Sequence, residues 1–523
     1  MRHDLYLGIE FGSTRIKAVL IDETHTPIAS GSHPWASTFC NGFWTYSLSD
    51  VWEGLQACYR ALQTDYAGKC NETLTTIAGI GVSAMMHGYL AFDAQDRLLV
   101  PFRTWQNTTT TQASKTLGEA FQVQIPQRWS VAHLYQAMQN GESHVRSIAY
   151  LTTLAGYVHW QLTGERVLGV GDASGMFPLA DDGSRYNPVL MDTFDNLAKP
   201  FSVPWRLASI LPEIRFAGDG AGTLTASGAA RLDPSGKLKA GVPFCPPEGD
   251  AGTGMTATNS VRVGTGNISA GTSIFSMVVL QKPLAAMQPN IDMVATPEGA
   301  PVAMVHCNNC CGDLDAWVRF FGTLLDAFGA HTDDDTLYRT LFSAAQAGQT
   351  DCGGLLSFPL QTGEPILGLS QGVPMLLRPR DAQLSVSNFM RAQLDSALCT
   401  LRIGMDELLD AGVRLDTLTG HGGFFKSGTA AAAMTAAAMH TPITLRKTAG
   451  EGGPWGMAIL AAYRMRKEPQ QTLTQYLEQC VFSAFDGVTI EPNACDAEGF
   501  ETYLERFRRY LDAERSAAEV QHA

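Results

Sequence analysis

The sequence predicts an α/β protein built from two similar halves. Three observations carry this prediction: strand-like apolar runs alternate with helical spacing, a hairpin of small residues opens the chain at residues 8–22, and a second such hairpin follows at 260–280. Alternation of strand, helix and strand is typical of layered α/β folds. At 523 residues the chain is also long enough for roughly two to four domains.

The first half begins with apolar runs at Leu5–Ile9 and Ile16–Ile21, which we expect to form two strands. A helix is expected over Asp50–Leu62, because apolar residues recur there at helical spacing and Ser49 can cap it. The next elements are expected in chain order as a strand at Ile77–Ser83, a strand at Tyr89–Asp93, and a helix at Ser147–Leu162 that Gly164 ends.

The second half repeats the opening pattern. Strands are expected at Val261–Val263, Asn267–Ala270 and Ile274–Leu280, with Gly271-Thr272-Ser273 between the last two, as Gly12-Ser13-Thr14 lies between the first strands. The repeat suggests a duplicated chain with a boundary near residue 258.

Both hairpins have the composition of a phosphate-binding loop. Glycine lets backbone N–H groups approach an anion, and Ser and Thr hydroxyls add donors. Two such loops from two domains could hold one polyphosphate from both sides. The alternative is that both are ordinary tight turns, and their recurrence at matched positions weighs against it.

A third glycine-rich stretch lies further along the chain. We expect a strand at Leu415–Leu418, a loop at Gly420–Ser427 and an alanine-rich helix at Thr429–Met439. A strand, a glycine loop and a helix N-terminus together favour a nucleotide phosphate. The loop nearly fits the P-loop spacing, but Phe425 stands where the second glycine is required, so we predict a nucleotide-proximal loop and not a P-loop.

Composition narrows the class of partner. The formal net charge of −14 disfavours nucleic acid and anionic membranes, which attract basic patches. No apolar run approaches the roughly 18 residues of a membrane span, and the first residues lack a signal-peptide core. We therefore expect a cytoplasmic protein with a small-molecule substrate. Its 11 scattered cysteines fit reduced thiols better than a disulfide framework.

Seven segments, in order along residues 5–465, resemble the FGGY carbohydrate kinases, most closely their xylulokinase branch. They are GIEFGSTRIKAVLID, SAMMHG, GDASGMFPLADDGSRYN, PEGDAGTG, ISAGTSIF, GHGGFFKS and EGGPWGMAILAAYR. The resemblance implies two actin-like (ribonuclease H-like) domains with a central cleft. Residues 1–258 would bind the sugar and carry the first phosphate loop, 259–480 would bind ATP, and 481–523 would form a helical extension. ATP and Mg²⁺ are implied as cofactors, and a homodimer is left open.

The resemblance also implies roles for particular residues. Asp250, between small neighbours, would be the general base, although a helix-capping Asp is the alternative. Glu10, where most relatives have Asp, would hold Mg²⁺ together with Asp250. The implied sugar contacts are Met86, His87, Trp105 and Asn107, and the implied nucleotide contacts are Gly12, Ser13, Thr14, Arg15, Gly271, Thr272, Gly422, Gly423, Lys426 and Ser427. Taken alone, a histidine such as His87 is more often a structural residue than a sugar contact.

The expected reaction is ATP-dependent phosphorylation of a small sugar or polyol, such as the ketopentoses xylulose and ribulose. Asn107 and Thr109 replace an Asp and an Arg of the family pattern, and Glu364 has lost the Arg that follows it in relatives, which leaves the sugar open. A noncatalytic ATP-driven switch is the alternative. A zinc site is a third and weaker interpretation of His306, Cys307, Cys310 and Cys311, because no second CxxC or HxxxH pair lies nearby.

Overall fold

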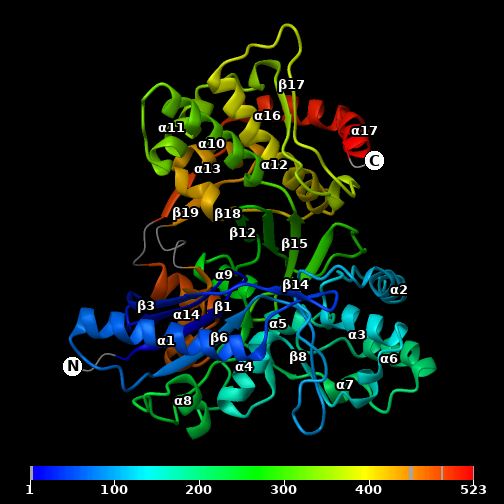
Figure 1. Cartoon of the computed structure of the whole chain (residues 1–523), viewed down its shortest axis with the longest axis vertical. Coiled ribbons are helices and arrows are strands. Elements are labelled where there is room, and N and C mark those ends of the chain that lie inside the picture. The colour runs from blue at the N-terminus through cyan, green and yellow to red at the C-terminus, as the bar shows by residue number, and fades with distance from the viewer. Residues whose placement is uncertain (1–3, 447–451, 484–486, 522–523) are drawn as a thin grey trace.

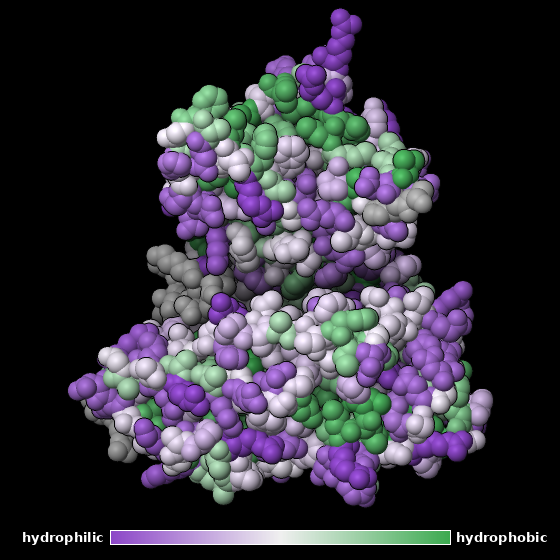
Figure 2. Space-filling view, viewed as in Figure 1, coloured by the Kyte–Doolittle hydropathy of each residue, from purple (hydrophilic) through white to green (hydrophobic). Residues whose placement is uncertain are grey.

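The structure, a computed structural model, describes residues 4–446, 452–483 and 487–521. It has two lobes, each built on its own β-sheet (Figure 1). The surface is hollowed between the lobes (Figure 2). The predicted α/β class with two domains around a central cleft is confirmed.

The lower lobe in Figure 1 contains a five-stranded sheet in the order β3-β2-β1-β6-β11. Its strands are β1 (Tyr6–Phe11), β2 (Arg15–Ile21), β3 (Pro27–Pro34), β6 (Gly79–Ala84) and β11 (Glu248–Gly249). The first three strands are antiparallel, and β6 and β11 then run parallel to β1. All six residues of β1 are buried, because covered sheets place both faces in a core.

The upper lobe contains a seven-stranded sheet in the order β14-β15-β13-β12-β18-β19-β20. Its strands are β12 (Thr265–Ala270), β13 (Ile274–Val279), β14 (Ile291–Ala295), β15 (Pro301–Cys307), β18 (Thr417–His421), β19 (Ile443–Arg446) and β20 (Gly487–Ile490). Its core β15-β13-β12-β18-β19 repeats the order and directions of the first sheet, as the duplicated hairpins predict. β20 lies inside the expected helical extension, so residues 481–523 also complete this sheet.

Helices cover both sheets. Those of the lower lobe are α1 (Leu48–Cys70), α2 (Thr111–Phe121), α3 (Ser130–Gln139), α4 (Leu154–Thr163), α5 (Val170–Ser174), α6 (Pro188–Ala198), α7 (Leu207–Ile210), α8 (Ala226–Leu232) and α9 (Asp250–Ala257). Those of the second half are α10 (Cys311–Ala327), α11 (Asp334–Gln346), α12 (Val386–Asp410), α13 (Thr429–Met439), α14 (Gly452–Arg466), α15 (Leu473–Tyr476), α16 (Ala494–Arg509) and α17 (Leu511–Gln521).

The short strands pair locally. They are β4 (Thr38–Cys40) with β5 (Phe43–Thr45), β7 (Leu90–Phe92) with β8 (Tyr150–Thr152), β9 (Val167–Gly169) with β10 (Glu213–Arg215), and β16 (Leu356–Phe358) with β17 (Met375–Leu377).

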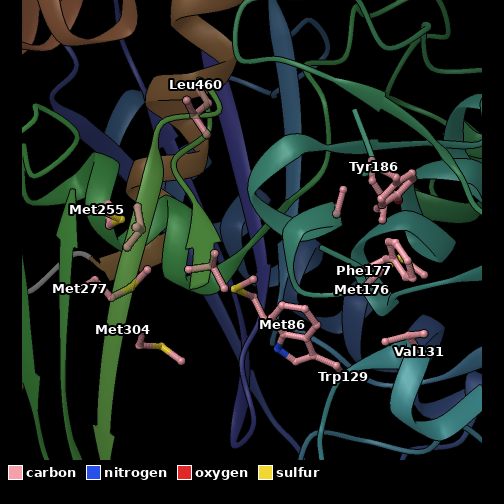
Figure 3. Close-up of a cluster of buried hydrophobic side chains, with 14 of the residues drawn as sticks. Met86, Trp129, Val131, Met176, Phe177, Tyr186, Met255, Met277, Met304 and Leu460 are labelled. Carbon is pink, nitrogen blue, oxygen red and sulfur yellow. The ribbon is translucent and has the colours of Figure 1, made fainter. Parts of the chain in front are cut away.

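Helix α14 crosses the expected division of the chain. It comes from the second half but packs on β1, β2, β6 and α9 of the lower lobe (Figure 1). The Trp455 indole N–H donates to the backbone carbonyl of His25 at 2.9 Å. The two lobes also share one hydrophobic cluster, in which Met86 and Met255 lie near Met277 and Met304 of the second sheet (Figure 3). In space, therefore, the first domain includes α14.

Three local expectations differ from the structure. Ser47, not Ser49, caps α1, and its Oγ accepts the Asp50 N–H at 3.0 Å. Residues 261–263 form a turn, not a strand. Residues 147–162 split into β8 and α4, because Thr152 pairs with Leu90 across the β7–β8 ladder and overrides the local helical spacing. Gly164 ends α4 as expected.

The contact between β1 and α14 yields a stability prediction. A Cβ added to Gly8 would lie 2.0 Å from the carbonyl oxygen of Pro454, which is backbone that cannot turn away. We expect Gly8→Ala to destabilise the lower lobe by about 1–3 kcal/mol or more, as overpacking does. Thermal and urea unfolding measure the change.

Gly68→Ala is the matched control, because a Cβ there meets nothing within 4 Å. Gly68 lies within α1, so alanine should leave stability unchanged or raise it by up to about 1 kcal/mol. Equal melting temperatures for Gly8→Ala and wild type would contradict close packing of α14 on β1.

Candidate active site

A cavity of about 460 Å³ lies between the two sheets, and both lobes line it. The first lobe contributes Glu10, Ser13, Lys17, Met86, His87, Trp105, Arg128 and Asp250, and the second contributes Asn267, Ser269, Ser273, Phe275, Met304, His306 and His421. Ser269 pairs in register with Phe275 on one side and His421 on the other, and Phe275 pairs with His306. These second-lobe residues therefore share the sheet face that looks into the cleft.

The carbonyl groups of the loop between β1 and β2 all accept hydrogen bonds, so this loop offers an anion few repelling lone pairs. The Phe11 carbonyl accepts from Met85 N and the Arg15 carbonyl from Gly12 N. Side chains donate to the next two carbonyl groups. Trp35 Nε1 donates to the Gly12 carbonyl at 2.7 Å, and Tyr46 OH donates to the Ser13 carbonyl at 2.6 Å.

The Thr14 carbonyl of this loop accepts from Trp35 N at 3.1 Å. In the part of the chain that the structure describes, the N–H groups of Ser13 and Thr14 have no acceptor. Free N–H groups beside occupied carbonyls make an anion-binding concavity. Arg15 lies at the exposed rim, and its guanidinium donates to Ser32 Oγ at 2.9 Å.

The carbonyl groups of the second glycine loop, between β12 and β13, are also occupied, but their hydrogen-bond donors are different. The Gly271 carbonyl accepts from Cys311 N and the Thr272 carbonyl from Cys310 N, both at 3.0 Å, while the Ser273 carbonyl accepts from Gly271 N at 2.9 Å. The two cysteines at the start of α10 thus hold this loop through their backbone.

A second cavity, of about 540 Å³, lies beside this loop. Its lining residues are Gly271, Thr272, Cys311, Leu314, Asp315, Asp335, Tyr338, Arg339, Phe342, Gly423, Phe424 and Lys426. Gly422 must be glycine, because its φ is +97° and a Cβ would lie 2.3 Å from the Ala270 carbonyl oxygen. The Phe425 ring lies over Gly420 and fills the space beside it. The side chain of Ser427 lies outside the described residues.

Asp250 lies at the junction of β11 and α9. Its Oδ1 accepts the Met86 N–H at 3.1 Å, and burial raises the pKa of its carboxyl to about 6. Gly249 occupies the N-cap position of α9, so Asp250 is the first residue of the helix and not its cap.

Glu10 is buried on β1, directly across the ladder from Lys17. Burial raises the pKa of Glu10 to about 7, with Lys17 lowering it and Asp250 raising it further. The longer side chain reaches the first turn of α14, where a Cβ on Gly453 would lie 1.6 Å from Glu10 Oε2. Glycine at 453 is therefore what makes room for glutamate at 10.

His87 adopts a left-handed backbone with φ of +68° and turns its ring into the cavity. The ring Nδ1 lies 3.1 Å from the Gly175 carbonyl, which accepts, so Nδ1 carries the proton and Nε2 remains an acceptor. Burial lowers the pKa of His87 to about 3, and the ring is therefore neutral at physiological pH. It lies parallel to the Trp129 ring at a centroid distance of 6.3 Å.

Asn107 has a different environment from the one expected. It is buried outside the cavity lining, and its Oδ1 accepts the Trp44 N–H at 2.8 Å. Its Nδ2 donates to the Trp44 carbonyl at 2.9 Å and to the Thr104 carbonyl at 3.0 Å. These bonds tie the Trp105 loop to the β4–β5 hairpin and leave no donor or acceptor atom of the side chain unused.

Several lining residues were not predicted from the sequence. Lys17 could have been found from strand periodicity, because it faces the same side as Glu10. Arg128 and His306 carry no such signal, since each reaches the cleft through tertiary packing. Arg128 forms an ion pair with Asp292 of β14, and burial lowers the pKa of His306 to about 4.

The cysteine cluster does not form a metal site. Among the described residues no three His, Cys, Asp or Glu side chains gather as metal ligands. Cys307, Cys310 and Cys311 are buried free thiols, and the sulfur atoms of Cys310 and Cys311 lie 3.6 Å apart.

A magnesium site needs few protein ligands, since one or two carboxylates and the phosphates of the substrate are enough to hold the ion. The buried, mutually repelling carboxyls of Glu10 and Asp250 fit that donor set.

Ser13 of the first loop, Ser273 of the second loop and the Asp250 carboxyl line one cavity between the two lobes, which is the arrangement of a two-lobed phosphoryl-transfer enzyme. The sequence profile of the FGGY family of carbohydrate kinases, N-terminal domain, matches residues 5–254, and the profile of its C-terminal domain matches residues 266–465. The chain belongs to the FGGY family of carbohydrate kinases and is an ATP-dependent sugar kinase. This membership supports the sugar kinase over the noncatalytic switch.

Relatives and solved structures agree with this membership. The chain is 22% identical to the xylulose kinase of Haemophilus influenzae over 437 residues, which are 81% of this chain and 83% of that protein. It shares its fold with the ligand-bound xylulose kinase of Lactobacillus acidophilus and with the gluconate kinase of that organism. In each case the TM-score is 0.81, the identity is 17%, and 99% of both chains is covered. None of the described helices is long and apolar enough to cross a membrane.

Burial of Asp250 predicts a pH-dependent cost in stability. Its carboxyl has an ordinary pKa of 3.8 in the unfolded chain and about 6 in the folded protein, so folding favours the protonated form. Wild-type stability therefore falls, relative to Asp250→Asn, as pH rises from 3.8 through about 6. In magnesium-free buffer at pH 8 we expect the variant to be more stable by up to about 3 kcal/mol.

The difference in free energy of unfolding between Asp250→Asn and wild type should fall by pH 4.5 to about a third of its value at pH 8, because the wild-type carboxyl is then largely protonated in the folded protein. Urea unfolding at both pH values measures it. A variant that is no more stable than wild type at pH 8 would contradict the burial of an ionised Asp250.

The bonds of Asn107 yield a second prediction. Asn107→Asp replaces a donor with a carboxylate oxygen that faces the Trp44 and Thr104 carbonyls. We expect a loss of about 1–3 kcal/mol and an unchanged ranking of sugars. Thr108→Asp is the control, because it adds the same charge at an exposed position. A changed sugar ranking with unchanged stability would show instead that position 107 faces the acceptor.

Proposed function

We propose that the protein transfers the γ-phosphoryl group of ATP to a hydroxyl of a small neutral sugar, a ketopentose such as xylulose or ribulose, with Asp250 as the general base. One observation carries the proposal: a buried carboxyl with a pKa of about 6 shares one cavity with the first phosphate loop and with a neutral histidine acceptor. A base is most effective when its pKa lies near the operating pH.

The residues divide the work of phosphoryl transfer. The free N–H groups of Ser13 and Thr14 would hold the γ-phosphoryl oxygens, and Lys17 would neutralise their charge. Glu10 and Asp250 would hold Mg²⁺, which when bound neutralises the nucleotide phosphates. The second cavity would take the nucleoside, with Gly271, Thr272, Gly422, Gly423 and Lys426 around the phosphates.

The sugar side favours a neutral acceptor. Nε2 of His87 would accept a hydroxyl hydrogen, Met86 would pack against carbon, and the Trp105 face would stack on C–H groups. The nearby cation Arg128 is already paired with Asp292, so an acid such as gluconate would find no free counter-charge there.

We place the enzyme in the cytoplasm, where ATP is supplied, and leave a homodimer open. We divide the chain into a sugar domain over residues 1–258 and an ATP domain over 259–480 with its 481–523 extension, with α14 counted in space with the sugar domain.

The decisive variant is Asp250→Asn. The amide still accepts the Met86 N–H but cannot take a hydroxyl proton, so we expect kcat to fall by about 10² to 10⁴ with little change in the KM for ATP. ADP release is measured over pentuloses, hexuloses, polyols and gluconate. Near-normal turnover of the variant would reject Asp250 as the base, and gluconate as the preferred acceptor would reject the neutral-sugar assignment.

A further inference from the structure

Trp105 links the sugar side of the cavity directly to the first phosphate loop. Its indole Nε1–H donates to Ser13 Oγ at 3.0 Å, and both residues line the same cavity. They are far apart in the chain, and Trp105 comes from the loop that Asn107 ties to the β4–β5 hairpin.

The loop backbone is fixed independently of this bond. Trp35 and Tyr46, whose rings stack at 4.2 Å, hold the Gly12 and Ser13 carbonyls. The Ser13 hydroxyl is different, because among the described residues its hydrogen bond comes from Trp105. A hydroxyl has one hydrogen and two lone pairs, so when Oγ accepts from Trp105 its own hydrogen points elsewhere and is free to donate. Accepting one hydrogen bond also strengthens the bond that the same hydroxyl donates.

The Trp105 ring is more exposed than the rings that hold the loop carbonyls. Its side chain belongs to a residue that is 37% exposed, and within the described chain its ring stacks on no other aromatic ring. By contrast, the aromatic residues that hold the loop carbonyls are buried or half-buried and packed together. A molecule seated against the Trp105 face would therefore fix the indole and, with it, the Ser13 hydroxyl.

We propose that Trp105 is a positioning residue that couples occupancy of the acceptor subsite to the grip of the first phosphate loop on the nucleotide, through the Ser13 hydroxyl. The proposal rests on the proposed function, because it takes the occupant of the subsite to be the sugar. The coupling is reciprocal: a sugar that strengthens nucleotide binding has its own binding strengthened by the same factor. We also expect ATP hydrolysis to be slow without sugar, because the Trp105 ring then holds the Ser13 hydroxyl less firmly.

The test compares nucleotide affinity with and without an acceptor. A nonhydrolysable ATP analogue with Mg²⁺ is titrated calorimetrically, alone and with saturating D-xylulose, D-ribulose or gluconate, into wild type, Trp105→Phe, Ser13→Ala and the double variant. Phenylalanine keeps an aromatic face and loses only the N–H donor. The ratio of the two affinities is the coupling factor, typically 5- to 150-fold where two sites are coupled.

We expect the coupling factor to fall toward 1 in each single variant and no further in the double variant, because either change removes the same bond. Trp44→Phe is the matched control: it is a neighbouring tryptophan, 39% exposed, whose indole N–H has no acceptor among the described residues, and its coupling should equal that of wild type.

A wild-type coupling factor in Trp105→Phe, or single-variant losses that add in full in the double variant, would overturn the proposal. The readout is affinity and not turnover. Intact coupling in a wild-type protein that phosphorylates none of the sugars would contradict the proposed function alone.

Discussion

The site depends on one constraint: a loop that is to hold phosphate must have its carbonyl oxygens occupied, since free lone pairs would repel the anion. The two halves of this chain meet that constraint with different chemistry. In the first loop, indole and phenol donors from Trp35 and Tyr46 hold the carbonyls. In the second, the backbone N–H groups of Cys310 and Cys311 do so. The hairpins repeat, and their supporting donors do not.

The site also lowers the stability of the folded protein, because carboxyl groups lie away from water around it. Helix α14 packs on β1 and on α9, and there Glu10 of β1 is buried while Asp250 at the start of α9 is half-buried. Glu248, two residues before Asp250, is buried and accepts the Asp172 N–H at 3.0 Å, which ties α5 to β11. Burial raises the pKa of each of these carboxyls, so the folded protein loses stability wherever they ionise.

Sequence reasoning succeeded where local chemistry decides the structure. Both hairpins, the helix Thr429–Met439 and the stop at Gly164 follow from glycine, alanine and strand patterns. It failed where a distant partner decides: β8 replaced part of a helix because it pairs with β7, and Asn107 turned to the Trp44 backbone and away from the sugar side. Arg128 and His306 reach the cleft only through packing of the two sheets, which no local pattern encodes.

Helix α14 has a consequence for biosynthesis. Residues 1–258 leave the ribosome long before Gly452–Arg466, the helix that covers β1 and β6. Until then the nascent lower lobe exposes an apolar strip, and Gly8 faces an empty slot that the Pro454 backbone later fills. The first lobe to be synthesised therefore stays incomplete until α14 has emerged, so it cannot close as an independent unit when its own residues leave the ribosome, and its exposed sheet is a natural client for chaperones that hold unfinished chains.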